Sequence, residues 1–316
     1  ERIQYNEKTL WSGGPQPDST DYNGGNYQDR YKVLAEIRKA LEEGNRQKAK
    51  QLAERNLVGP NNAQYGRYLS FGDIFMVFNN QKKGLEDVTD YHRDLDISEA
   101  ISTTSYSQDG TTFKRETFSS YPDDVTVTHL SKKGDKTLDF TLWNSLTEDL
   151  LANGDYSWEY SNYKQGGVTT DSNGILLKGT VKDNGLQFAS YLGIKTDGQV
   201  TAQDGYLTVT GASYATLLLS AKTNFAQNPK TNYRKEINLE ETVKSIVEAA
   251  KEKDYETLKH DHIKDYQSLF NRVQLNLGGN KSSQTTKEAL HTYNPEKGQK
   301  LEELFFQYGR YLLISS

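Results

Sequence analysis

The sequence contains no cysteine, and this absence excludes disulfide bonds, thiol catalysis and cysteine-ligated zinc. It also lacks any apolar run near the roughly 20 residues that a membrane-spanning helix needs. The net charge is −5 and is spread along the chain. Nucleic-acid binding is therefore not expected, because it needs a basic stripe with interleaved aromatic residues. These absences leave a polar, aromatic-containing chain that is long enough for one large domain or two ordinary ones.

The sequence also lacks a leader pattern at its start. It opens at Glu1, its only methionine is Met76, and no charged segment is followed by an apolar run. We therefore expect no signal peptide, and either a processed mature protein or a fragment. The absence of cysteine and the abundance of Tyr, Asn, Thr and Lys favour an exported bacterial protein, extracellular or at the cell surface.

What the sequence does contain is a long region, about residues 68–225, that predicts β-structure throughout. Apolar residues alternate with polar ones, as in Leu138, Phe140 and Leu142. Turn dipeptides separate the short strands: Asp109-Gly110, Gly134-Asp135, Asn153-Gly154, Asn173-Gly174, Asn184-Gly185, Asp197-Gly198 and Asp204-Gly205. More than a dozen antiparallel strands are too many for one open sheet, so two packed sheets are expected.

Helical patterns stand on both sides of this region. Residues 29–58 predict a pair of helices with a break at Gly44-Asn45. After the strands, Asn238 and Glu241 resemble a capping box at the start of another helix. A further helix is expected to end at Gly278-Gly279, and residues 281–293 have the composition of a polar linker.

The last segment, residues 296–316, predicts a helix that needs neighbours. An apolar stripe runs along it at helical spacing: Leu301, Leu304, Phe305, Tyr308 and Leu312. Phe306, Leu313 and Ile314 make the opposite face apolar as well. Asn294 and Pro295 are the expected helix start, and no residue that commonly ends a helix follows. The stripe is therefore predicted to be a docking interface.

Two groups of polar residues are candidates for chemistry. Asp94 and Asp96 share one face of a strand, as a general acid and base would, but a solvated strand face is the favoured interpretation. His260 and His262 are two residues apart, so a helix directs them apart, whereas zinc-binding helices use a spacing of four. No metal ion is expected, and His262 is predicted to pack on the face of Leu258 and Tyr266.

Aromatic and glycine-rich segments give two further candidates. The LWSGGP block contains Trp11 and Ser12 but fits neither a phosphate loop nor a nucleophile motif, so a packed loop anchored by Trp11 is favoured. Tyr156, Trp158 and Tyr160 share one face of a predicted strand and, with Trp143, could stack on sugars. Packing across strands is the favoured alternative. The residues by themselves indicate no convincing active site.

Several blocks, in order along the whole chain, resemble the α-L-fucosidases of glycoside hydrolase family 95. They are ERIQYNEKTLWSGGP, YLSFGDIFMVF, YHRDLDISEAISTTSY, FKRETFSSYPDDVTVTHLS, HIKDYQSLFNRVQLNLG and FFQYGRYLLISS. The resemblance implies an N-terminal β-sandwich, a helical linker, a catalytic (α/α)6 barrel and a C-terminal β domain. It also implies inverting hydrolysis of terminal α-linked fucose by motifs that lie in the barrel. No catalytic residue therefore maps to this chain.

Together these observations predict a mainly β fold with α-helices, in which a large antiparallel β-sandwich (a super-sandwich) is followed by helices. The expected divisions are residues 1–235 for the sandwich with a helical insertion at about 29–58, 236–293 for the linker, and 294–316 for the first helix of a truncated (α/α)6 barrel. The expected partners are the missing barrel and, through the parent enzyme, a fucosylated glycan. No cofactor is expected, and the fragment alone is predicted to be inactive. The alternatives are a free-standing carbohydrate-binding or adhesin-like module and an α-L-galactosidase of the same family.

Overall fold

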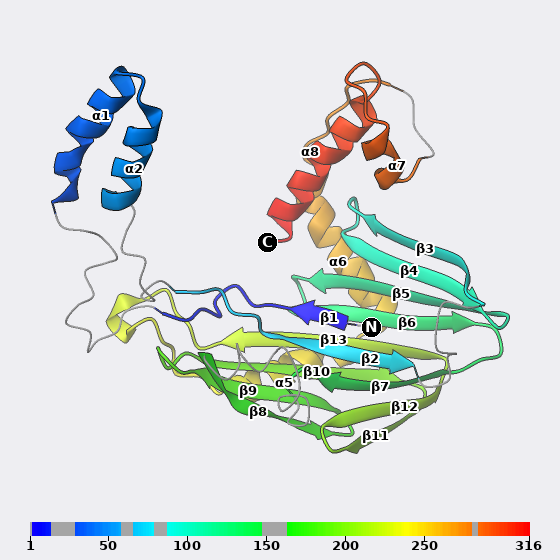
Figure 1. Ribbon diagram of the computed structural model, residues 1–316. Coiled ribbons are helices and arrows are strands. Elements are labelled where there is room, and N and C mark those ends of the chain that lie inside the picture. The colour runs from blue at the N-terminus through cyan, green and yellow to red at the C-terminus, as the bar shows by residue number, and fades with distance from the viewer. Residues whose placement is uncertain (1, 14–28, 58–65, 79–86, 147–162, 280–283) are drawn as a thin grey trace.

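Two antiparallel sheets form the centre of the molecule (Figure 1). The computed structural model describes residues 2–13, 29–57, 66–78, 87–146, 163–279 and 284–316. The five-stranded sheet contains, in spatial order, β1 (Arg2–Tyr5), β2 (Gly72–Phe78), β7 (Leu138–Asn144), β12 (Tyr206–Ala212) and β11 (Gln199–Gln203). The eight-stranded sheet contains β3 (Thr89–Asp96), β4 (Ile101–Gln108), β5 (Thr111–Ser120), β6 (Val125–Lys133), β13 (Tyr214–Thr223), β10 (Gln187–Thr196), β9 (Gly174–Val181) and β8 (Lys164–Asp171). The predicted two-sheet antiparallel architecture is confirmed.

The main core fills the space between the two sheets, and the predicted alternation explains it. Leu138, Phe140 and Leu142 of β7 are buried, whereas the residues between them are partly exposed. Two turns adopt the conformation that their sequences predict. Both residues of Asp109-Gly110 and of Asp204-Gly205 have positive φ, which is the geometry of a tight type I′ hairpin. Asn153-Gly154 lies outside the described residues.

Helices cover the outer face of the eight-stranded sheet. α5 (Leu239–Lys251) and α6 (Tyr255–Phe270) pack Val243, Val247 and Leu258 against the strands β5, β6, β10 and β13 in a second apolar cluster. The approach of α5 to β10 is close, because a Cβ atom on Gly193 would lie 2.5 Å from Cγ1 of Val247. The central strands are therefore buried on both faces, and the helices are an integral part of the sandwich.

A separate helical hairpin corresponds to the predicted pair at residues 29–58. It contains η1 (Arg30–Val33), α1 (Leu34–Glu42) and α2 (Arg46–Asn56), and Asn45 caps α2 by accepting a hydrogen bond from the Lys48 amide. Ile37, Ala40 and Ala49 form its own small apolar cluster. Figure 1 shows this hairpin standing apart from the sheets.

The helical region after the sandwich differs from the prediction in three places. α6 ends at Phe270 with Asn271 as its C-cap, well before Gly278-Gly279. The expected polar linker contains α7 (Thr286–His291), which a capping box of Thr285 and Glu288 begins. α8 (Gln299–Ile314) begins after Gly298.

The start of α8 differs because the expected cap is used elsewhere. Asn294 accepts a hydrogen bond from the amide of Glu296, and its carbonyl oxygen accepts one from Lys297. It therefore forms a turn of its own before the helix.

In the part of the chain that the structure describes, none of the helices is long and apolar enough to cross a membrane. A short 3-10 turn, η2 (Pro229–Thr231), precedes α5.

Candidate functional site

The terminal helix α8 is held on α6 by one face. Arg310 donates hydrogen bonds to the carbonyl oxygens of Phe270 (2.8 Å) and Val273 (3.0 Å), and its guanidinium lies 4.8 Å from the centre of the Phe270 ring. These oxygens lie at and just beyond the end of α6, where unpaired carbonyls and the helix dipole favour a cation. Tyr311 adds an edge contact to Tyr266. The position of α8 is thus fixed by groups outside its apolar stripe.

The predicted docking residues lie on the other side of α8. No residue of α8 is fully buried, and Phe305 is 77% exposed. Leu301, Leu304, Phe305 and Tyr308 line a mostly apolar groove of about 910 Å³. The facing walls of this groove come from β3 and from α7 and its flanks, including Ile97, Leu290 and Tyr293. Leu312 lies outside the groove and is also exposed. This groove and Leu312 are named the α8 docking surface below.

Asp94 and Asp96 are exposed on β3, as the favoured interpretation predicted. Asp94 lies 2.9 Å from Nε2 of His92 at the edge of the α8 docking surface. Asp96 instead accepts hydrogen bonds from the amide and hydroxyl of Ser98 and ends the strand. Their side chains therefore have separate partners and do not form an acid–base pair.

His262 is buried, as its expected packing on the Leu258 and Tyr266 face predicts. Its ring stacks on Phe118 with centroids 4.7 Å apart, and Nε2 lies 2.9 Å from the carbonyl oxygen of Glu99. Burial lowers the pKa of His262, against opposing hydrogen bonds to backbone groups. The described residues contain no cluster of His, Asp and Glu side chains suited to a metal ion.

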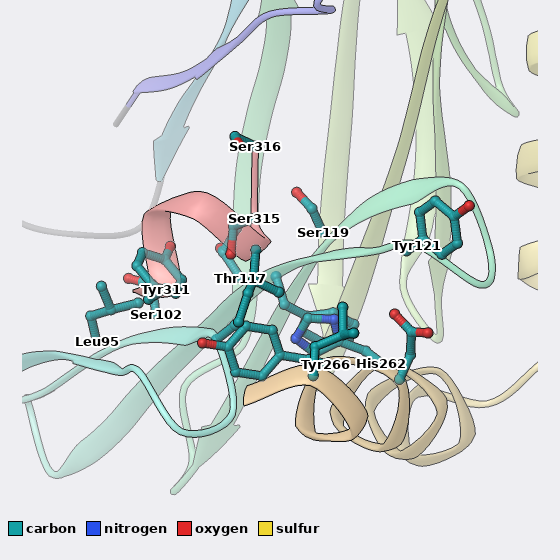
Figure 2. Close-up of a pocket in the computed structure, with 15 residues that line it drawn as sticks. Leu95, Ser102, Thr117, Ser119, Tyr121, His262, Tyr266, Tyr311, Ser315 and Ser316 are labelled. Carbon is teal, nitrogen blue, oxygen red and sulfur yellow. The ribbon is translucent and has the colours of Figure 1, made fainter. Parts of the chain in front are cut away.

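A second pocket of about 610 Å³ adjoins His262 (Figure 2). Strands β4 and β5, helix α6 and the C-terminal end of α8 form its walls, and Ser102, Thr117 and Ser119 are among the residues that line it. Tyr266 closes another side and donates a hydrogen bond of 2.7 Å to the carbonyl oxygen of Ile97. Burial raises the pKa of Tyr266 to about 12, so its hydroxyl stays a donor at neutral pH. No motif in the sequence predicts this pocket.

A row of acid, histidine and hydroxyl side chains crosses the eight-stranded sheet beneath α6. Glu116, His129 and Thr216 are neighbours in the strand pairing, and Nδ1 of His129 lies 2.8 Å from Oγ1 of Thr216. Such a set resembles an activated nucleophile. However, Thr216 is buried, and the Tyr255 ring stacks on the imidazole with centroids 3.8 Å apart. No substrate can reach the hydroxyl, so the row joins α6 to the sheet.

The electrostatics of this row have clear causes. Burial alone would raise the pKa of Glu116, but hydrogen bonds from Lys259 (2.7 Å) and Lys114 (3.0 Å) outweigh it and hold that pKa low. Burial lowers the pKa of His129 to about 4, although the charge of Glu116 opposes the shift. At neutral pH the row therefore consists of a charged carboxylate and an uncharged imidazole.

The remaining candidates from the sequence have mixed outcomes. Trp11 is half exposed and pairs with Tyr68, whereas Leu10 and Ser12 are the buried members of the block, so the anchor of the loop is not Trp11. Trp143 lies between Phe75 and Tyr206 in an aromatic row across three strands, which is cross-strand packing. Tyr156, Trp158 and Tyr160 lie outside the described residues, so their proposed sugar-stacking role stays a prediction.

Comparisons with known proteins connect this architecture with carbohydrate enzymes. Residues 1–228 match the family model described as "Glycosyl hydrolase family 65, N-terminal domain". Residues 254–316, which begin at the N-cap of α6, match the model "Glycosyl hydrolase family 95 catalytic domain". Over its full length the chain is 28% identical to the protein named Alpha-L-fucosidase 2 of Arabidopsis thaliana. It is 29% identical to Probable alpha-fucosidase A of Aspergillus niger.

These relatives are much longer than this chain, which covers 38% of each of them. A solved structure of a bacterial glucoamylase complexed with acarbose is similar with a TM-score of 0.38 and 12% identity. That likeness covers 63% of this chain and 32% of the other. The resemblance to family 95 seen in the sequence is confirmed by the family models and by the curated relatives together.

Proposed function

The chain belongs to the family of glycosyl hydrolase family 65 N-terminal domains, and from this premise we propose that it is the non-catalytic N-terminal part of an α-L-fucosidase-type glycoside hydrolase. Its role is to dock and position a catalytic (α/α)6 barrel through the α8 docking surface. The parent enzyme removes terminal α-linked fucose from glycans by inversion. The proposed division is a sandwich at residues 1–235, a linker at 236–293 and the first barrel helix at 294–316.

The observation that carries the docking role is the combination of a fixed helix with an uncovered apolar face. Arg310 holds α8 in one orientation, while Phe305, Leu312 and the groove beside β3 remain open to solvent. Large contiguous apolar surfaces on soluble proteins mark interaction sites. The match of this helix to a catalytic-domain model supports a barrel as the occupant.

The proposed lack of catalysis follows from the requirements of inversion. An inverting glycosidase needs two carboxyl groups about 6.5–9.5 Å apart with a water between them. The carboxylates that line the α8 docking surface are Asp94 and Glu302, and each has its own partner, His92 and the Tyr293 hydroxyl.

The test of inactivity is fucose release from 2′-fucosyllactose by the purified chain, for which we expect no activity above background. Release that disappears in Asp94→Asn or Glu302→Gln would overturn the proposal, because the chain would then contain its own active site. Equal release by the unsubstituted 316-residue chain and by both variants would indicate a contaminating enzyme.

The docking role is tested by adding a family-95 barrel as a separate chain. We expect association that Phe305→Glu and Leu312→Glu weaken by about tenfold or more, because each places a charge in an apolar contact. Leu41→Glu on α1 is the matched control, since Leu41 and Leu312 are similarly exposed at 53% and 49%. No association, or equal loss with the control, would count against docking through α8.

A further inference from the structure

A polar groove lies on the outer face of the eight-stranded sheet, beside the start of α5. One part of it, of about 690 Å³, is bounded by β8, β9, β10 and residues 237–240. A second part, of about 740 Å³, continues along the loop between β13 and α5, and the two parts share Gln187 and Ile237. Each volume is within the range of about 300–1,000 Å³ for small-molecule pockets. This groove is named the α5 groove below, and none of the residues that line it belongs to α8.

Strand pairing places three uncharged polar residues side by side across the α5 groove. Thr180 of β9 is paired with Gln165 of β8 on one side and with Gln187 of β10 on the other. The row is on the outer face, because Ala189, two residues after Gln187, packs in the cluster that contains α5. Gln165 and Gln187 are exposed, and within the described parts of the chain the three side chains have no hydrogen-bond partner. Their amide and hydroxyl groups are therefore available to a ligand.

Asn224 extends this row at the end of β13 and lines the second part of the groove. It is only 8% exposed, and its Oδ1 accepts a hydrogen bond of 2.9 Å from the backbone amide of Gln187. That bond fixes the orientation of the side-chain amide. Its Nδ2 has no acceptor among the described residues and is not one of the atoms shut off from solvent. The Asn224 donor is thus held in place and open to the groove.

Small and apolar residues form the rest of the first part of the groove. Gly167 of β8 has no side chain, and a Cβ atom there would meet nothing within 4 Å, so the space above it is open. Ile237 and Leu239 line the side next to α5. An apolar lining with a few fixed polar groups is the usual composition of a small-molecule site. The C–H face of a ring can pack on this lining while its hydroxyls meet the amide row.

The charged residues that line the α5 groove do not favour an ionic ligand. Lys178 pairs with Glu240 at 2.8 Å beside the start of α5. Arg234 donates hydrogen bonds to two backbone carbonyl oxygens, and Lys235 is followed by Glu236. An anion or a cation would therefore meet charges of both signs.

The shape and composition of the groove also disfavour peptides and nucleic acids. Peptides commonly bind by adding a strand to a free sheet edge, but β9 and β10 are each paired on both sides. Nucleic acids need aromatic side chains for stacking, and the one aromatic residue in the described lining, Phe188, is buried in the main core. We propose that the α5 groove is a binding site for a neutral oligosaccharide. This site goes beyond the docking role of α8 and does not depend on it.

Calorimetric titration of the full 316-residue chain with maltotriose, cellotriose and lacto-N-tetraose tests the proposal. We expect saturable binding of at least one of them with a dissociation constant on the order of 1 mM. Gln187→Ala removes the side chain that both parts of the groove share. Asn224→Asp keeps the acceptor for the Gln187 amide and removes the Nδ2 donor. Each should weaken binding by about three- to tenfold, the usual effect of losing a hydrogen bond.

Two substitutions outside the groove are matched controls and should bind as the unsubstituted chain does. Gln203→Ala removes an exposed glutamine from β11. Asn276→Asp changes an exposed asparagine whose Oδ1 likewise accepts a hydrogen bond from a backbone amide, that of Gly278 at 3.0 Å. They separate an effect of the groove from a general effect of the same chemical change.

Thermal unfolding of each variant shows whether it remains folded. Gln187 is exposed, so Gln187→Ala should unfold at the same temperature as the unsubstituted chain and gives the decisive comparison even if Asn224→Asp is less stable. The proposal is overturned if no oligosaccharide binds up to about 50 mM, where millimolar affinity would saturate the site. It is equally overturned if both groove variants bind as the controls do, or if sulfate or triglycine binds in place of the oligosaccharides.

Discussion

Charged side chains concentrate where the helices meet the eight-stranded sheet. Lys259 of α6 reaches Glu116 of β5, and Lys253 bridges Asp123 of the β5–β6 turn and Asp261 of α6. Hydrogen bonds to both carboxylates raise the pKa of Lys253. Because Glu116 and Asp123 are largely buried, removing one partner would leave an uncompensated charge there. These pairs therefore fix the register of the helices on the sheet.

His129 makes the stability of the protein sensitive to pH. Its folded pKa of about 4 lies below the ordinary value of 6.5, so the unfolded chain binds this proton first as pH falls. The uncharged His129 ring therefore contributes fully to the free energy of unfolding above pH 6.5, and this contribution is lost as the pH falls from 6.5 to about 4. Over this pH window we expect the free energy of unfolding of His129→Gln to fall by about 2 kcal/mol less than that of the unsubstituted chain. This value allows for solvent screening at the partly exposed ring.

Chemical denaturation at a series of pH values measures this difference. Glu116, whose folded pKa is depressed, loses its contribution only below its ordinary pKa of 4.5. In the interval from pH 6.5 to about pH 5 the difference between the two proteins therefore reports His129, because His262, whose pKa burial also lowers, is present in both. Parallel stability curves for the two proteins across that interval would show that the imidazole is not held neutral by burial.

One side of α8 packs on the rest of the chain, and the other side is exposed. Its contacts with α6 combine a hydrogen bond from Arg310 to the Phe270 carbonyl oxygen with packing of Tyr311 and Ile314 against Tyr266 and Phe270. Beyond the end of α6, Glu303 accepts a hydrogen bond from the Leu277 amide. Its apolar stripe lies along the α8 docking surface and is not covered in this chain. The energy that normally holds an amphipathic helix in place is thus still available for a partner.

Without a barrel, the same surface should cause self-association. We expect concentration-dependent dimers or larger species of the isolated chain, because the exposed stripe is contiguous and apolar. The double variant Phe305→Glu/Leu312→Glu should be monomeric at the same concentrations with an unchanged unfolding temperature, since both side chains are exposed. Sedimentation velocity measures the species, and Leu41→Glu is the control that should associate like the parent chain. If the unsubstituted chain stays monomeric, the apolar stripe of α8 is covered within the molecule.

The molecule as a whole contains apolar clusters of very different size. The main cluster joins both sheets, a second joins the eight-stranded sheet to α5 and α6, and a small third cluster belongs to the helical hairpin. The hairpin cluster has only Ile37, Ala40 and Ala49 as buried members. Its stability therefore depends on a few contacts, whereas each buried residue between the sheets supports the entire sandwich.

Matched core substitutions should reveal these as separate cooperative units. Phe140→Ala removes a fully buried ring between the sheets and should lower the global free energy of unfolding by about 3–5 kcal/mol. Ile37→Ala should reduce amide hydrogen-exchange protection in α1 and α2 and leave the strands as protected as before. Hydrogen exchange with mass spectrometry measures both, and loss of strand protection in Ile37→Ala would mean that the hairpin and the sandwich unfold together.

Local patterns carried enough information to predict the elements of this protein. The alternation in Leu138, Phe140 and Leu142 and the turn at Asp109-Gly110 depend only on neighbours in sequence, so the sandwich class could be predicted. The stripe of α8 was readable for the same reason. α7 was missed because it is short and polar, although its capping pair Thr285 and Glu288 is visible in the sequence.

Only the tertiary structure decided which distant residues meet. β7 lies between β2 and β12, and Tyr5 reaches Ser190, a partner 185 residues away. The pocket beside α6 is likewise lined by residues from distant elements, among them Ser102 of β4, His262 of α6 and Tyr311 of α8. Periodicity specifies which face of a strand or helix is apolar, whereas the choice of the face that covers it depends on packing across the whole chain. The sequence therefore determined the layers and the docking stripe, and packing created the pocket, the buried charge row and the orientation of α8.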